Sequence, residues 1–465
     1  MALLQSIDGH IHRRETINWL NWLILIGLGC VCLADYVSSI WEIRLEKDNY
    51  PTPWTIRIAG VPIAEIFIFA CFILSLIQNY TKKNHVNIFR KMPLDWYVLI
   101  ISAITIYGAA VGLITFSEND IWRVWLYDAR LTINFVVVYW LVSRIPRNAE
   151  HVHLLWRFMI IYSFIFFFNN LLGWFYWVYW VGYSPLGALS MGSLILTDAG
   201  NVAFLGYICI MGALILVSGV ETTKIRWLFG ILGIFCFLLL LISLRRSNLL
   251  AIGIAIPLSL ALLSSKKIIR RFVKFIPVFL VLAVILYFAG LDWNQYIKSF
   301  FTLLDRSYDS VEQRYIGNEN VMLNMQKNNL WITGLGIGRH YYAYRQMPKD
   351  DLTGFSQDEI DQPWRHIIHV TNPFYWNLLK YGIIIGTFFT LLPIYMLIYI
   401  KRQSRKLSTD RMNQVFVVTS MVAVCAPFYN VLGPIDPKNA IITGAIIGLC
   451  SATMRYQNYH QVIRH

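Results

Sequence analysis

Long apolar runs separated by short polar connections dominate the chain from end to end. Because about 20 apolar residues cross the hydrocarbon of a bilayer, this pattern predicts twelve membrane-spanning helices. The fold class expected is therefore all-α, a polytopic integral membrane protein. The predicted spans are residues 17–38, 58–79, 95–116, 131–143, 155–175, 200–220, 226–244, 248–263, 275–290, 373–400, 413–432 and 438–454.

Basic residues then set the predicted orientation, because cytoplasmic connections retain an excess of Lys and Arg. Every second connection is basic, and an even number of helices agrees with the result that both termini are cytoplasmic. The residues that carry this pattern are Lys82, Lys83, Arg90, Lys91, Arg144, Arg147, Arg157, Lys224, Arg226, Lys266, Lys267, Arg270, Arg271, Lys274, Lys401, Arg402, Arg405, Lys406 and Arg411.

Composition excludes a soluble protein of ordinary kind. Of 465 residues, 57% are hydrophobic and 14% are charged, whereas a soluble chain of this size is less than half apolar. All seven cysteines fall inside apolar runs, which favours neither a disulfide framework nor a zinc site. We expect membrane lipids, and no nucleic acid, among the partners.

One connection is much longer than the others and divides the chain into three parts. Residues 1–290 hold the first nine predicted helices, residues 291–372 form a large outer loop, and residues 373–465 hold the last three helices and the C-terminus. Long connections are usually functional or disordered. Aromatics, glycines and both charge signs favour a folded loop, and apolar spacing at 293–304 and 321–331 predicts short helices there.

Histidines and arginines supply the candidate chemistry on the outer side. His340, His366 and His369 belong to the large loop, and histidine is suited to proton transfer near neutral pH. Arg245 and Arg246, in the run SLRRSNLL, occupy a very short outer turn. Charge at that place suggests a functional site, and forked guanidinium donors match phosphate oxygens; the alternative is that both arginines reach lipid headgroups.

Further arginines and a glycine-rich stretch extend the candidate site. Arg306, Arg314, Arg339 and Arg345 either add to a phosphate-binding cluster or pair with neighbouring carboxylates. The stretch Gly334-Leu-Gly-Ile-Gly338 permits a tight turn or a close approach of the backbone to a ligand. Nucleotide and zinc-protease motifs do not accompany it. Because the outer compartment lacks nucleotide triphosphates, a transferase acting there would need a donor that is already activated, such as a lipid diphosphate.

The order of these motifs resembles the bacterial O-antigen ligase and O-antigen polymerase superfamily. The run SLRRSNLL is followed by Arg314, by the glycine-rich stretch and then by TNPFYWNLLKYGIIIG at residues 371–386, which looks like the family's His-Asn-x-x-Leu segment with its trailing Gly-Ile-x-Gly. The match covers residues 240–390. The sequence departs from the pattern at Thr371, where the family usually has His; His369 and His366 lie earlier in the chain.

The resemblance implies a membrane glycosyltransferase of polysaccharide or lipopolysaccharide biosynthesis in the bacterial inner membrane. Its donor would be a glycan on undecaprenyl diphosphate, and its acceptor another glycan or a lipid A core sugar, with no metal and no cofactor. Arg245, Arg246, Arg314, Arg339 and His340 would bind the diphosphate. The catalytic group would be completed by Arg314 together with His369 or His366. Other polysaccharide-assembly proteins are possible partners.

Two alternatives stay open at the level of sequence. Polymerase and ligase share the donor and differ in the acceptor, and no residue separates them. A secondary transporter, or a polysaccharide-export protein, also fits twelve helices with both ends inside. Transporters usually have related halves and polar, broken helices near the bilayer midplane. Here Glu65, Asn169 and Asn170 are the main polar residues predicted within spans.

Overall fold

The protein is seen in a computed structural model that describes part of the chain. The described residues are 21, 23–30, 57–58, 61–81, 91–117, 122–146, 148–179, 199–218, 223–242, 246–263, 268–274, 277, 281, 284, 309–345, 364–366, 372–407, 411–425 and 437–462.

Helices account for 87% of the described residues. In chain order the elements are β1 (Arg57–Ile58), β2 (Val61–Pro62), α3 (Ile63–Thr81), α4 (Asp95–Ile114), α5 (Trp122–Arg144), α6 (Ala149–Tyr179), α8 (Ala199–Ser218), α9 (Thr223–Ile242), α10 (Arg246–Leu263), α13 (Asp309–Lys327), β3 (His340–Tyr342), β4 (Trp364–His366), α15 (Pro373–Lys406), α16 (Arg411–Cys425) and α17 (Pro437–Val462). The two strand pairs, β1 with β2 and β3 with β4, are short and antiparallel.

Within the described residues, three helices are long and apolar enough to cross a membrane. They are Asp95–Ile114, Ala149–Phe168 and Phe374–Lys406. Shorter apolar helices coincide with other predicted spans, among them Ile63–Ile77 and Ala440–Tyr456. The mostly helical fold and its membrane character therefore agree with the sequence analysis, whereas the number of twelve spans stays a prediction.

The fourth predicted span, residues 131–143, is shorter than the helix that the structure shows there. Helix α5 begins at Trp122, nine residues earlier, and carries Asp128 and Arg130 as part of the helix. Charged residues at these positions suggest a polar connection when only the sequence is read. In the fold their charges are matched by partners on neighbouring helices, so the helix continues through them.

Helices α5 and α17 pack with their backbones in close contact. A Cβ added at Gly444 would lie 2.6 Å from the Phe135 carbonyl oxygen, and one added at Gly448 would lie 2.9 Å from the Tyr139 carbonyl oxygen. Two glycines four residues apart on one helix thus face two residues four apart on the other. Small residues at this spacing let membrane helices approach closely.

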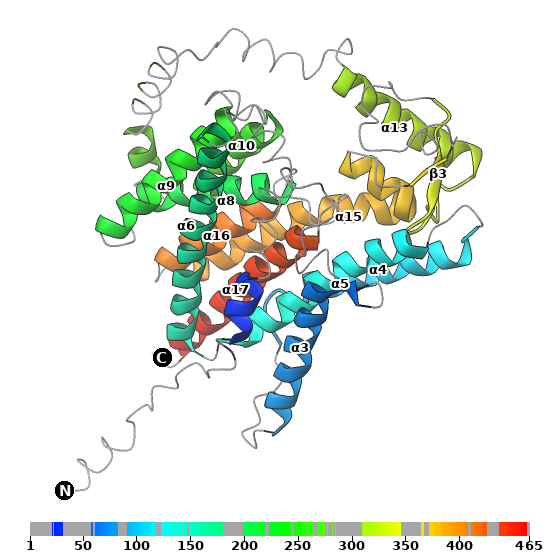
Figure 1. Cartoon of the computed structure of the whole chain (residues 1–465). Coiled ribbons are helices and arrows are strands. Elements are labelled where there is room, and N and C mark those ends of the chain that lie inside the picture. Colours follow the sequence, from blue (N-terminus) through cyan, green and yellow to red (C-terminus); the bar gives the residue numbers. More distant parts are fainter. Residues whose placement is uncertain are drawn as a thin grey trace, which may run out of the picture.

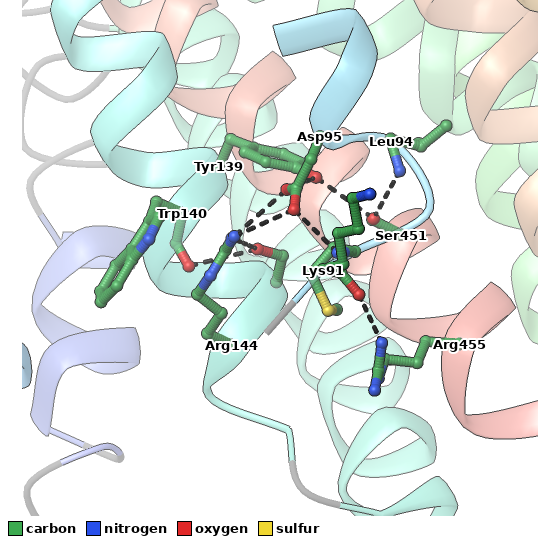
Figure 2. Close-up of polar contacts among 10 residues, drawn as sticks. Lys91, Leu94, Asp95, Tyr139, Trp140, Arg144, Ser451 and Arg455 are labelled. Atoms are coloured by element: carbon green, nitrogen blue, oxygen red, sulfur yellow. Dashed lines mark hydrogen bonds and ion pairs between the residues drawn. The ribbon is translucent and has the colours of Figure 1, made fainter. Parts of the chain in front are cut away.

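A polar cluster closes one end of this helix pair (Figure 2). Asp95, in the first turn of α4, accepts from the Tyr139 hydroxyl at 2.8 Å and from the Arg144 guanidinium at 3.2 Å. Ser451 of α17 accepts from the Leu94 amide at 3.1 Å and lies 3.3 Å from the Tyr139 hydroxyl. Three segments far apart in sequence are therefore tied together at one end of the bundle, which we call the basic end.

The described part of the large loop packs over the opposite end. Figure 1 shows α13 and β3 beside α4 and the first turns of α15, away from α17. A small apolar core joins α13, the segment before β3, β3 itself and α15; it consists of Val321, Met325, Leu335, Tyr341, Trp376 and Leu379. The helix predicted at 321–331 is real but begins at Asp309 and ends at Lys327, and the helix predicted at 293–304 lies outside the described residues.

Candidate functional site

The glycine-rich stretch forms a tight loop wedged between helices. We call residues 334–338 the glycine loop. Its three glycines, Gly334, Gly336 and Gly338, have φ angles of 71°, 86° and 72°. A Cβ at Gly336 would lie 2.2 Å from the Gly112 nitrogen, and one at Gly338 would lie 2.3 Å from the Trp125 Cα. Glycine is needed there both for the left-handed conformation and for the close approach.

All five amides of the glycine loop donate within the protein. The bonds are Gly334 to the Leu330 carbonyl (2.9 Å), Leu335 to the Leu379 carbonyl (2.6 Å), Gly336 to the Lys380 carbonyl (3.0 Å), Ile337 to the Gly108 carbonyl (2.8 Å) and Gly338 to the Asp128 carboxylate (3.3 Å). A backbone anion site needs amides that point at the ligand. Of the two interpretations left open by the sequence, the tight turn holds, because these amides are already engaged.

Helix α15 is broken at Gly382, and the break receives the glycine loop. Gly382 has φ 76° and ψ 177°, so the helical bond from the Ile383 amide to the Leu379 carbonyl is lost. The Ile383 amide instead donates to the Trp331 carbonyl at 2.7 Å, and the Leu379 carbonyl accepts from the loop. The exchange satisfies the backbone groups that the break would otherwise leave unpaired.

A buried ion pair lies at the end of the glycine loop. The Lys380 ammonium is 2.9 Å from the Asp128 carboxylate, and their side chains are 7% and 6% exposed. The same Asp128 oxygen accepts from the Gly338 amide. The Lys380 nitrogen also lies 4.0 Å from the centroid of the Trp376 ring, which holds the ammonium on a second side. Helices α5 and α15 and the loop thus meet at one carboxylate.

The position of this pair along the helices places it far from the basic end. From Gly382 to Lys401 the helix rises about 28 Å, and from Asp128 to Arg144 about 24 Å. The hydrocarbon of a bilayer is about 30 Å thick. With Lys401 and Arg144 at one membrane boundary, as the sequence predicts, the Asp128–Lys380 pair and the helix break would lie close to the other boundary.

The glycine loop leads directly into two predicted site residues. Arg339 and His340 follow Gly338, and the two residues are 9% and 6% exposed. His340 opens β3, and its backbone is the register partner of His366 on β4. The His340 ring packs edge-on against Tyr342, with centroids 5.5 Å apart. Two of the residues proposed from sequence, His340 and His366, thus lie opposite each other in one strand pair, and Arg339 directly precedes it.

The remaining predicted site residues are placed only in part. Arg314 lies on α13, which packs against α15 and β3, and Arg246 is the first residue of α10. The side chains of Arg246, Arg314 and His366 lie outside the described residues, as do Arg245, His369 and Arg306 altogether. Arg345 pairs with Glu319 at 2.5 Å on the surface, the second of the two roles considered for it.

Sequence analysis missed Asp128, Lys380 and the partners of Glu65. Glu65, which it did single out, is fully buried and lies 2.9 Å from the Arg130 guanidinium and 3.2 Å from the Asn134 amide. Ionisable residues within apolar helices are costly unless paired, so each is a signal of a partner. The signal at Asp128 and Arg130 was lost because the predicted span began after them.

No protein-family model matches the chain, and no curated protein matches it.

Proposed function

We propose that this protein is a membrane glycosyltransferase that moves a glycan from undecaprenyl diphosphate to a sugar acceptor on the periplasmic face of the bacterial inner membrane. The observation that carries the proposal is the junction at Gly382. There amides of the glycine loop donate to backbone carbonyls of the 371–386 segment, and both are among the motifs on which the family resemblance rests. Arg339, His340 and the strand of His366 lie next to this junction.

The proposed topology has twelve spans, with the basic end and both termini in the cytoplasm. Exposed Lys401, Arg402, Arg405 and Lys406 at the end of α15 support this orientation, because positive charge is retained on the cytoplasmic side. The strand pair and α13 would then cover the periplasmic end, where lipid-linked glycans are presented to acceptors.

The chemistry assigned to the site is displacement at the anomeric carbon of the donor sugar. The acceptor hydroxyl oxygen bonds to that carbon as the bond to the diphosphate oxygen breaks. The hydroxyl proton passes to His366 or His369, and Arg245, Arg246, Arg314, Arg339 and His340 are the candidates to hold the departing diphosphate. A fixed donor to developing negative charge typically contributes about 2.7–4 kcal/mol, and a general base about 10²–10⁴ in rate. Since Arg339 and His340 are mostly buried, the donor has to uncover them on binding.

The first test removes one guanidinium at a time. Arg314→Ala and Arg246→Ala should each lower glycan transfer at least ~10²-fold, the loss expected for one donor to a developing oxyanion. Transfer is measured as glycan banding in a strain that lacks the gene and carries each variant at equal membrane level. Arg345→Ala is the matched control, because this arginine lies on the same loop but is exposed and paired with Glu319.

Further measurements of glycan transfer test the role of the arginines, distinguish a ligase from a polymerase and test metal independence. Full transfer by both variants would remove the diphosphate-binding role of these arginines. Loss of all attached glycan in the deletion strain identifies a ligase, whereas a single attached repeat identifies a polymerase. Inhibition by EDTA that a divalent ion reverses would contradict a metal-independent reaction.

A secondary transporter is the second candidate, and the broken helix α15 with its buried Asp128–Lys380 pair is the observation in its favour. Transporters place such breaks near the bilayer midplane. With Lys401 at the cytoplasmic boundary of the proposed topology, the rise of about 28 Å to Gly382 supports a break near the other boundary, which favours the transferase. Uptake of labelled substrate into vesicles that survives Arg314→Ala would reverse that preference.

A further inference from the structure

We infer that Asp128 is a positioning residue, which holds Arg339 and His340 in the orientation that donor recognition requires. The inference rests on the proposed function for the part played by Arg339 and His340. Asp128 belongs to α5 and lies 210 residues before Gly338 in the sequence.

The geometry gives Asp128 control of the last bond of the glycine loop. Four of the five loop amides donate to backbone carbonyls, which no side-chain substitution can remove. The fifth, Gly338, donates to the Asp128 carboxylate, and Gly338 immediately precedes Arg339. Loss of this acceptor would free the backbone at a position with φ 72°, where glycine has several conformations available.

Lys380 keeps the carboxylate in place. Its ammonium donates to the same oxygen as Gly338, at 2.9 Å, and its backbone carbonyl accepts from Gly336. One residue of α15 thus holds the loop directly through its backbone and indirectly through Asp128. Stability alone does not account for the pair, because replacing a buried ion pair by apolar side chains is often neutral or stabilising.

That property supplies the test. The double variants Asp128→Asn/Lys380→Met and Asp128→Leu/Lys380→Met both remove the two buried charges together, so neither leaves an uncompensated charge inside the bundle. The Asn variant keeps a carbonyl oxygen that can accept from the Gly338 amide, and the Leu variant does not. A difference in loop exchange or in transfer between the two variants therefore measures the effect of the hydrogen bond to the Gly338 amide.

The first readout does not depend on activity. Hydrogen exchange of purified protein in detergent should be at least ~10-fold faster over residues 334–342 in the Leu variant than in the Asn variant, a ratio that corresponds to ~1.4 kcal/mol of local opening. Exchange over α13 residues 309–327 is the internal control and should be equal in the two. Equal exchange of the loop in both variants would overturn the anchoring role of Asp128.

The second readout is transfer of a lipid-diphosphate-linked glycan in proteoliposomes. We expect the Leu variant to have kcat/KM lower by ~10² than the Asn variant, the size of effect that follows from misplacing binding groups by about 1 Å. Rescue by the Asn side chain is the outcome that a merely structural role would not produce. Faster loop exchange with unchanged transfer would overturn the role in donor recognition. Absence of transfer by the wild type would overturn the proposed function, while the exchange comparison would still decide whether Asp128 anchors the loop.

Discussion

At Gly338 both the backbone conformation and the surrounding space require glycine. Its φ of 72° is in the left-handed region, and the Trp125 Cα occupies the place where a side chain would begin. The residue lies between the anchor at Asp128 and the pair Arg339 and His340. A substitution at Gly338 therefore tests whether the packing of the glycine loop is needed for the candidate site.

Gly338→Ala should lower the stability of the protein markedly. A non-glycine residue in such a conformation costs about 1–3 kcal/mol, and the added Cβ collides with backbone in addition. The control is Gly253→Ala, because nothing lies within 4 Å of a Cβ at this helical position. That change should be neutral or stabilise by about 0.5–1 kcal/mol. Thermal unfolding in detergent measures both, and equal unfolding temperatures would contradict the packing described for the loop.

The sequence singles out some residues beside the glycine loop, but it does not show which contacts hold them. Arg339 and His340 were found because they follow a conspicuous glycine pattern on the predicted outer side. Asp128 and Lys380 are 252 residues apart, and each alone resembles an unfavourable charge near a membrane. The two charges neutralise each other through a tertiary contact, and the apolar periodicity of the sequence gives no information about such contacts.

Helix α5 is the element on which the two ends of the described bundle depend. Near its start it meets the glycine loop through Asp128 and α3 through Arg130, and near its end it meets α4 through Arg144. Between these contacts its backbone lies against the glycines of α17. A change in the α5–α17 contact should therefore affect the whole helix.

Gly444→Leu should separate α5 from α17 and destabilise the protein. Forcing a larger side chain into a packed contact typically costs about 1–3 kcal/mol, and here the obstacle is the Phe135 carbonyl, which cannot rotate away. The next residue provides the control. Ala445 lines an apolar groove of about 70 Å³ between residues 25–29, α5, α6, α8 and α17, so Ala445→Leu should be tolerated. Similar unfolding temperatures for the two variants would argue against the close helix contact.

For helix α15, the sequence predicted the start of the helix but not the break inside it. Helix α15 begins where its sequence indicates, because Asn372 accepts from the Phe374 amide at 3.0 Å as an N-cap and Pro373 occupies the first turn. The break at Gly382 was not predicted, since apolar residues continue on both sides of it. The break is stabilised by hydrogen bonds with the glycine loop and the residues before it, which are distant in sequence from α15.

At the scale of the whole molecule, the described bundle has two chemically different ends. One end gathers Asp95, Arg144, Ser451 and the basic C-terminal turns of α15, and the other carries α13 and the β3–β4 pair. From the alternation of basic connections we expect the first of these ends to face the cytoplasm, and this orientation stays a prediction. Which end faces the cytoplasm is the part that an experiment has to decide.

Site-directed thiol labelling tests the orientation directly. A membrane-impermeant maleimide applied to intact spheroplasts should label the Asn328→Cys variant, because position 328 is exposed just after α13. The Lys406→Cys variant, exposed at the end of α15, should react only after permeabilisation. The parent protein without an added cysteine gives the background. Labelling in the opposite order would place residues 309–345 in the cytoplasm and remove the proposed donor site.

The pairing of α5 with α17 has a consequence for biosynthesis. Tyr139 and the serine that it meets on α17 are 312 residues apart, so at 5–20 residues per second the ribosome needs roughly 15–60 s to deliver the partner. Throughout that interval a newly inserted α5 has its closest neighbour missing and its paired charges incompletely matched. The contacts that α5 makes with α17 can therefore form only late in synthesis, long after α5 itself has left the ribosome.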